Sequence, residues 1–213
     1  MRVCLDDLLV VLDPVDSLFS AVTDLPSWAR ARLTIDGEPV TSLDIRACGL
    51  TIQAAMMRVA GADTNADVAG VCDLIEDPKR DPYAALAALL LGCPQSDETR
   101  EDVKRRVLKD LWFSTIGAQL RSGIGVAVRE RLPGFHEYLL RAKREIGHSE
   151  LASRTMQVES ALVIDLLPPV LAAEGIALVT VHDCVIVKAC EAARAKALFE
   201  GVLHTHGVRA IVM

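Results

Sequence analysis

Aromatic residues are scarce in this chain of 213 residues, where they make up only 4% of the positions. A core must therefore be built from aliphatic side chains, and the hydrophobic fraction of 51% excludes a disordered chain. No apolar run reaches the roughly 18 residues that a membrane span needs. Asp6 and Asp7 stand where an export signal would carry basic residues. We therefore expect a cytoplasmic protein without a membrane partner.

The chain also lacks any C-x-x-C pair among its six cysteines, which have apolar neighbours. They are Cys4, Cys48, Cys72, Cys93, Cys184 and Cys190. This pattern disfavours a disulfide framework or a zinc site and predicts reduced thiols.

Positive charge is in short supply overall, because the net charge is −6. The distribution is uneven: residues 100–154 hold 12 basic against 7 acidic residues, whereas residues 1–99 hold 7 against 16. A basic segment between acidic ones is typical of a surface that faces phosphates. The other interpretation is a pair of solvated helices, and charge alone favours it.

Two pairs of β-prone runs bracket the chain. Residues 31–35 and 40–45 flank Asp36-Gly37, and residues 176–181 and 184–188 flank a His-Asp turn. A further short strand is expected at 209–213. Helices are expected around Leu8–Leu12 and over 49–60, 82–91, 97–113, 133–146, 150–173 (bent at Pro168-Pro169) and 190–204, with a loop and a short helical piece at 61–82. The order predicts an α+β fold, a small antiparallel sheet backed by helices.

The His182-Asp183 turn is the most informative feature, because an ionised carboxylate between apolar strands is costly without a partner. Asp183 can bond its own backbone as an ordinary turn residue, or it can bind a metal ion. A metal site requires a second carboxylate. Asp44, at the end of its own strand, is the natural candidate, and the two meet only if their strands are sheet neighbours.

Three stretches resemble the family A DNA polymerases and the phage-type single-subunit RNA polymerases, in the order that this family shows. The His182-Asp183 turn, preceded by a helix with Gln157 and Glu159, resembles the third palm motif. The stretch from Asp44 to Leu50 resembles the first palm motif and is closer to its RNA polymerase version. The stretch 100–108 is similar to the fingers helix.

The resemblance implies one reduced polymerase domain over 1–213, with a palm at about 30–60 and 150–213 and a helical fingers-like insertion at about 61–149. It implies that Asp44 and Asp183 hold two Mg²⁺ ions, which Mn²⁺ can replace, and that His182 positions the primer terminus. Arg100 and Lys104, four residues apart on one helical face, would hold the triphosphate of the incoming nucleotide.

Further contacts follow from the same resemblance. Gln157 would touch the nascent base pair, Glu159 would contact substrate from the same helix, and Trp112 would take the place of the family's fingers aromatic. Cys184 departs from the family, which has Glu or Ser there, and the chain has no room for a full thumb. The implied partners are a primer and template, nucleoside triphosphates, and a second copy or partner subunit that completes the open cleft.

Two rival hypotheses remain. One keeps the fold but makes the chain a catalytically inactive or partner-dependent protein that binds nucleic acid or nucleotide. The other is a structural helical protein in which Asp44 and Asp183 lie far apart. The sequence leaves open whether the product is DNA or RNA and whether a primer is needed.

Overall fold

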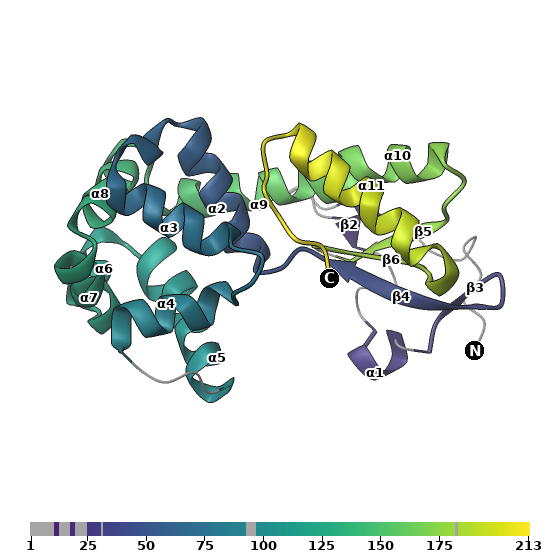
Figure 1. The fold of residues 1–213 in the computed structure, drawn as a ribbon, viewed down its shortest axis with the longest axis horizontal. Coiled ribbons are helices and arrows are strands. Elements are labelled where there is room, and N and C mark those ends of the chain that lie inside the picture. Colours follow the sequence, from purple (N-terminus) through teal and green to yellow (C-terminus); the bar gives the residue numbers. More distant parts are fainter. Residues whose placement is uncertain (1–10, 13–17, 20–24, 31, 93–96, 182) are drawn as a thin grey trace. The chain divides into compact units, whose positions relative to one another are not determined.

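The computed structural model describes residues 11–12, 18–19, 25–30, 32–92, 97–181 and 183–213. The fold is α+β, as the sequence predicted: mostly helical, with a small antiparallel sheet (Figure 1). The chain forms two compact units. Unit 1 combines Met1–Cys48 with Gln157–Met213, and unit 2 is Gly49–Met156. Residues 49–60 and 150–156, which the resemblance assigns to the palm, fall in unit 2.

Unit 1 holds the sheet. Its elements in chain order are β1 (Val11–Leu12), β2 (Leu18–Phe19), α1 (Ser27–Arg30), β3 (Thr34–Ile35), β4 (Glu38–Asp44), the end of α9 (His148–Ser160), the π-helix η4 (Ala161–Leu166), α10 (Leu167–Ala173), β5 (Leu178–Val181), β6 (Cys184–Lys188), the 3-10 helix η5 (Ala189–Glu191) and α11 (Ala192–Thr205). The main sheet has the order β3-β4-β6-β5, and every neighbouring pair is antiparallel. Strands from the two ends of the sequence therefore lie side by side at its centre.

The first hairpin forms where the sequence predicted it. Asp36 and Gly37 connect β3 to β4, and both have positive φ angles, 53° and 82°. A two-residue turn of this kind matches the twist of paired strands, and Asp-Gly is a preferred sequence for it. The hairpin sets where β4 begins and therefore which residue, Asp44, stands at its far end.

The sheet of unit 1 is covered on both faces. Helix α11 contacts β4 and β6, and α10 contacts β5 (Figure 1). Val185 and Val187, which are buried, alternate with Ile186 along β6 and so point to the opposite face. Ile186 and Val181 pack with Leu25 and Leu33. The central strand β6 is thus buried on two sides, which explains its nearly continuous apolar sequence.

The last residues of the chain secure the end of β4. The main-chain N–H of Asp44 donates to the carbonyl of Met213 at 3.0 Å, and its carbonyl accepts from the N–H of Met213 at 2.9 Å. Ile45 forms a β-bridge with Val212. Because β6 pairs with the other edge of β4, the backbone at Asp44 is held from both sides.

Unit 2 is helical. Its elements are α2 (Cys48–Val59), the 3-10 helix η2 (Ala62–Thr64), α3 (Ala66–Glu76), α4 (Pro82–Leu91), α5 (Asp97–Arg106), the π-helix η3 (Val107–Trp112), α6 (Ile116–Arg121), α7 (Gly123–Arg131), α8 (Pro133–Ile146) and the start of α9. The helix starts follow capping chemistry, since Asn65, Asp81, Thr115 and Ser122 each accept a hydrogen bond from the first turn of the next helix.

Arg58 ties the first two helices of unit 2 together. Its guanidinium bonds Glu76 through two nitrogens, at 2.9 Å and 2.8 Å, and also reaches Asp63 and Asp73. Because Arg58 is mostly buried in this network, its charge links α2, η2 and α3.

Four local predictions differ from the structure. Val11–Leu12 form a strand paired with Leu18–Phe19, so the expected helix at Leu8–Leu12 is wrong there, and Leu8–Val10 lie outside the described residues. The short helical piece expected within the loop at 61–82 is the 11-residue helix α3, longer than expected. The expected strand at 209–213 is reduced to one bridge. The helix bend expected at Pro168-Pro169 corresponds to the π-helix η4, which lies just before the two prolines. Prolines have no N–H group to donate to the carbonyls of the preceding turn.

One helical run among the described residues, His148–Ala173, is long and apolar enough to cross a membrane by length and composition. One such run is a weak indication, because helices inside ordinary protein cores pass the same test. Leu162, Val163, Leu167 and Leu171 of this run are buried in the structure.

Candidate acidic site in unit 1

The sheet register brings the two predicted metal-binding aspartates to the same end of neighbouring strands. Asp44, the last residue of β4, lies opposite Cys184, the first residue of β6. Asp183 directly precedes Cys184 in the turn from β5. Residues separated by about 140 positions in sequence therefore meet at one point of the sheet. This arrangement is the reverse of what the structural-protein hypothesis requires.

The chain leaves Asp44 through a strained turn. Ala47 has a φ of 50°, in the left-handed region that costs a residue with a Cβ roughly 1–2 kcal/mol. The turn starts α2 immediately after β4 and places Cys48 at its first position. Strain of this kind persists where surrounding contacts enforce it, and here the β-bridge at Ile45 precedes it.

A third carboxylate joins the two aspartates. Glu159, on α9, accepts a hydrogen bond from the Cys48 thiol, with Sγ and Oε2 3.5 Å apart. Burial, and then the negative charges of Asp183 and Asp44, raise the pKa of Glu159 to about 7. Near neutral pH this carboxyl group is therefore shared between its protonated and ionised forms.

Burial and the nearby carboxylates also raise the pKa of the two neighbouring thiols, Cys48 and Cys184. Burial, followed by Glu159, Asp183 and Asp44, raises the pKa of the Cys48 thiol. Burial raises the pKa of Cys184 to about 11, with smaller contributions from the same two aspartates. Both cysteines are free thiols and stay protonated at neutral pH. They are neutral neighbours and leave the negative charge to the carboxylates.

The donor set suits a hard cation. Oδ1 of Asp44 is buried from solvent, and the neighbouring ionisable oxygens belong to Asp183 and Glu159. Across the described ranges, no group of three or more His, Cys, Asp and Glu side chains is arranged to hold a metal ion. In proteins generally, Mg²⁺ is bound through one or two carboxylates and takes its remaining ligands from waters and substrate phosphates, so a magnesium site here stays a prediction.

Two more residues are assigned to the palm by the resemblance, Gln157 and His182, and the structure describes only Gln157. Gln157 is exposed, whereas Glu159, two positions on, is partly buried. Two helical steps turn the side chain by about 200°, so the structure places the two on different faces of α9. His182 lies outside the described residues, and its role stays a prediction.

The predicted triphosphate residues belong to unit 2. Arg100 donates from Nη2 to Asp81 at 2.9 Å and from Nη1 to Glu101 at 2.7 Å, and its guanidinium lies 5.5 Å from the centre of the Tyr83 ring. Lys104, one turn later on α5, is exposed and makes no ion pair with any described residue. Of the two predicted triphosphate residues, Arg100 is therefore already paired, and Lys104 is available.

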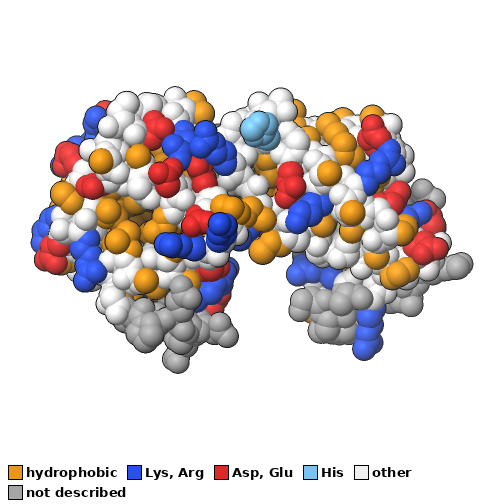
Figure 2. All heavy atoms as spheres, viewed as in Figure 1, with side chains coloured by type: hydrophobic (Ala, Val, Ile, Leu, Met, Phe, Trp, Pro, Cys, Tyr) orange, Lys and Arg blue, Asp and Glu red, His pale blue; other side chains and the backbone are white. Residues whose placement is uncertain are grey.

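Charge neutralisation also limits the predicted basic surface. Arg105 and Arg106 both pair with Asp102, and Arg144 pairs with Glu137. Figure 2 shows Lys and Arg side chains interspersed with Asp and Glu on the visible face. Part of the basic charge in 100–154 is thus paired with acidic side chains, as on a solvated helix face, whereas other residues such as Lys104 make no ion pair with a described residue.

Trp112 does not lie where a substrate could reach it. Its side chain is 1% exposed and packs on Phe135 with ring centres 5.3 Å apart. It is the last residue of η3, whose apolar face is part of the core of unit 2. We therefore leave Trp112 out of the proposed site.

No protein family model matches this chain, and no curated protein matches it either. The site is therefore defined by its own geometry. That geometry adds Cys48, which the sequence analysis did not select. Its position four residues after Asp44 was the available signal, because a helix that starts at the end of a strand presents its first residue beside the strand's last one.

Proposed function

We propose that this chain is a template-dependent nucleotidyltransferase of reduced palm type, in which Asp44 and Asp183 hold two divalent cations. The proposal rests on one observation, the β4–β6 register that pairs Asp44 with Cys184 next to Asp183. Like charges that meet at one sheet end repel each other, and a cation offsets this repulsion. Burial, and then the negative charges of Asp183 and Asp44, raise the pKa of the neighbouring Glu159, so the surroundings of this carboxyl group are also short of positive charge.

The chain's own residues supply position and charge. When bound, the cations would lower the pKa of an attacking 3′-hydroxyl and neutralise the leaving pyrophosphate. Asp44 is held by β6 on one side and by the Met213 main chain on the other, so its carboxylate needs little reorganisation to act. Lys104 is free to bind a phosphate, and Arg100 would exchange Asp81 for one.

A second candidate function has its own support. A catalytically inactive or partner-dependent palm-like protein, which binds nucleic acid or nucleotide, accounts for the burial of Trp112 and for the pairing of Arg100 with Asp81. It also accounts for Cys184 at a position where the resembled family carries Glu or Ser.

Primer extension separates the two functions. A labelled primer on a template is incubated with Mg²⁺ or Mn²⁺ and with deoxynucleotides or ribonucleotides in separate reactions. The expected result is extension by the wild type, loss by at least 100-fold in Asp183→Asn, and wild-type extension in Asp165→Asn, an exposed carboxylate of the same unit. Absence of extension with both nucleotide sets, while nucleic acid still binds, would favour the accessory function.

A further inference from the structure

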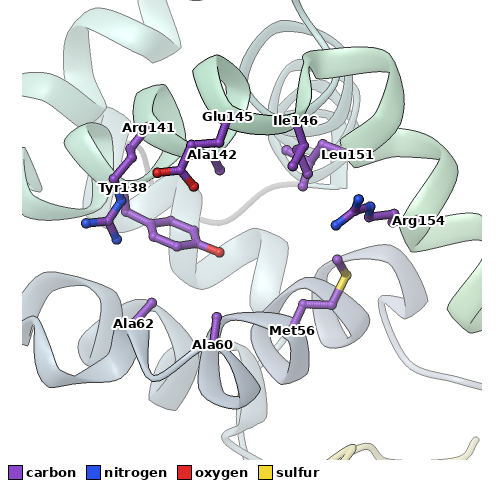
Figure 3. A pocket seen from close by; sticks show the side chains of 10 residues that line it. All are labelled: Met56, Ala60, Ala62, Tyr138, Arg141, Ala142, Glu145, Ile146, Leu151 and Arg154. Atoms are coloured by element: carbon purple, nitrogen blue, oxygen red, sulfur yellow. The ribbon is translucent and has the colours of Figure 1, made fainter.

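Unit 2 contains a cavity of about 360 Å³, formed between the end of α2 and the facing parts of α8 and α9 (Figure 3). All its lining residues belong to unit 2, whereas the acidic site belongs to unit 1. Its volume falls within the range of about 300–1,000 Å³ that is usual for small-ligand sites. No function proposed above uses it.

The cavity combines an apolar floor with polar groups at its rim. Met56, Ala60 and Leu151 provide apolar surface. Tyr138 and Arg154 point into the same space from opposite ends, as Figure 3 shows. A few convergent polar groups over an apolar floor is the usual composition of a ligand site.

The rim groups keep hydrogen-bonding capacity for a ligand. The Tyr138 hydroxyl bonds no described residue, and burial raises the pKa of Tyr138, so it stays a donor. Arg141 makes no ion pair with the described residues, and Arg154 uses only Nε, toward Glu150 at 2.9 Å. The terminal nitrogens of both guanidinium groups are therefore open to an anion.

The carboxylate of Glu145 at the rim indicates that the ligand carries a hydrogen-bond donor. Glu145 lines the cavity without an ion pair to a described residue, so it can accept from an N–H or O–H donor of a ligand. The ligand should thus carry an anion for Arg154 at one end of the cavity, and a flat ring with a hydrogen-bond donor for Tyr138 and Glu145 at the other end.

We propose that this cavity binds one nucleotide unit, with the base against Tyr138 and the phosphate on Arg154, at the opposite end of the cavity (Figure 3). An aromatic ring with N–H donors joined to a phosphate matches all three requirements, and base stacking on an aromatic side chain adds affinity. The unit can be a free mononucleotide or part of a single strand. The site needs no metal ion and no residue of unit 1, so it stands apart from the proposed polymerase activity.

The test is a binding experiment on the full chain in EDTA. Adenosine monophosphate, ribose 5-phosphate, inorganic phosphate and an eight-residue oligodeoxyadenylate are titrated by calorimetry. We expect the mononucleotide or the oligonucleotide to bind about tenfold more tightly than ribose 5-phosphate. Arg154→Gln should weaken that binding about tenfold. Arg144→Gln, on α8 and outside the cavity, should leave it unchanged.

The outcomes separate the ligand sources and the two proposals. Tighter binding of the oligonucleotide identifies a strand, and equal or tighter binding of the mononucleotide identifies a free nucleotide. The proposal is overturned if neither binds, if ribose 5-phosphate binds as well as the nucleotide, or if Arg144→Gln weakens binding as much as Arg154→Gln. Asp183→Asn should bind the nucleotide as tightly as the wild type does. A failure of primer extension would therefore not bear on whether the cavity binds a nucleotide.

Discussion

Replacing Glu159 by Gln should change how the stability of the protein depends on pH. The pKa of Glu159 is raised from 4.5 to about 7, first by burial and then by Asp183 and Asp44. Each pH unit between the two values corresponds to about 1.4 kcal/mol, which sums to about 3 kcal/mol. Because the side chain is partly exposed, screening by solvent reduces this to about 1–2 kcal/mol.

The sign follows from proton binding. A folded state with the higher pKa holds the proton longer, so the contribution of Glu159 to stability is complete below pH 4.5 and is lost as the pH rises to about 7. Glu159→Gln cannot ionise and should not show this loss. The free energy of unfolding of the variant, relative to the wild type, should therefore increase by about 1–2 kcal/mol between pH 4.5 and 7.5.

Urea unfolding followed by circular dichroism, in EDTA at several pH values, measures this difference. Hydrogen exchange of peptides from β6 reports on unit 1 alone. Asp165→Asn is the matched control, because it removes an exposed carboxylate from the same unit. Parallel pH profiles for the wild type and Glu159→Gln would refute the placement of Glu159 beside the two aspartates.

Two further predictions concern unit 2. Gly125→Ala should destabilise the protein by about 1–3 kcal/mol, because the added Cβ would lie 1.9 Å from the main-chain oxygen of Gln119. In the matched variant Gly70→Ala the added Cβ meets no atom within 4 Å, so this substitution should stabilise the protein by up to about 1 kcal/mol. Equal effects in thermal unfolding would contradict this packing. Burial lowers the pKa of Lys143 to about 8, so the free energy of unfolding of the wild type should rise as the pH increases from about 8 to 10.5. Lys143→Met should lack this rise. A rise of the same size in both proteins would show that another group titrates.

Local chemistry was enough to predict many elements of this fold, although α6 and α7 were not predicted. The Asp36-Gly37 turn, the proline at the start of α4 and the glycine after it all act over a few residues, and each element formed where those signals stand. The short strand at Val11 was missed because its partner at Leu18, rather than its own sequence, makes it a strand. The π-helices were missed because nothing in a 3.6-residue pattern distinguishes them.

The site was only partly predictable, because it depends on contacts between residues that are far apart in the sequence. Asp44 and Asp183 were selected because each stands at the end of an apolar strand, but whether they meet depends on a strand pairing across most of the chain. Glu159 is predicted as a substrate contact, and only the folded structure shows that the charges of the two aspartates act on it, whereas Gln157 is exposed. Trp112 was misjudged, since an aromatic residue on an amphipathic helix more often belongs to the core.

Binding of Mn²⁺, measured by electron paramagnetic resonance on the full chain without nucleotide, tests the central claim most directly. Asp44 and Asp183 should form a shared cation site, so Asp44→Asn and Asp183→Asn should each weaken Mn²⁺ binding about tenfold or more, and Asp165→Asn should bind like the wild type. Equal Mn²⁺ affinity in all four proteins would contradict a cation site at the β4–β6 end.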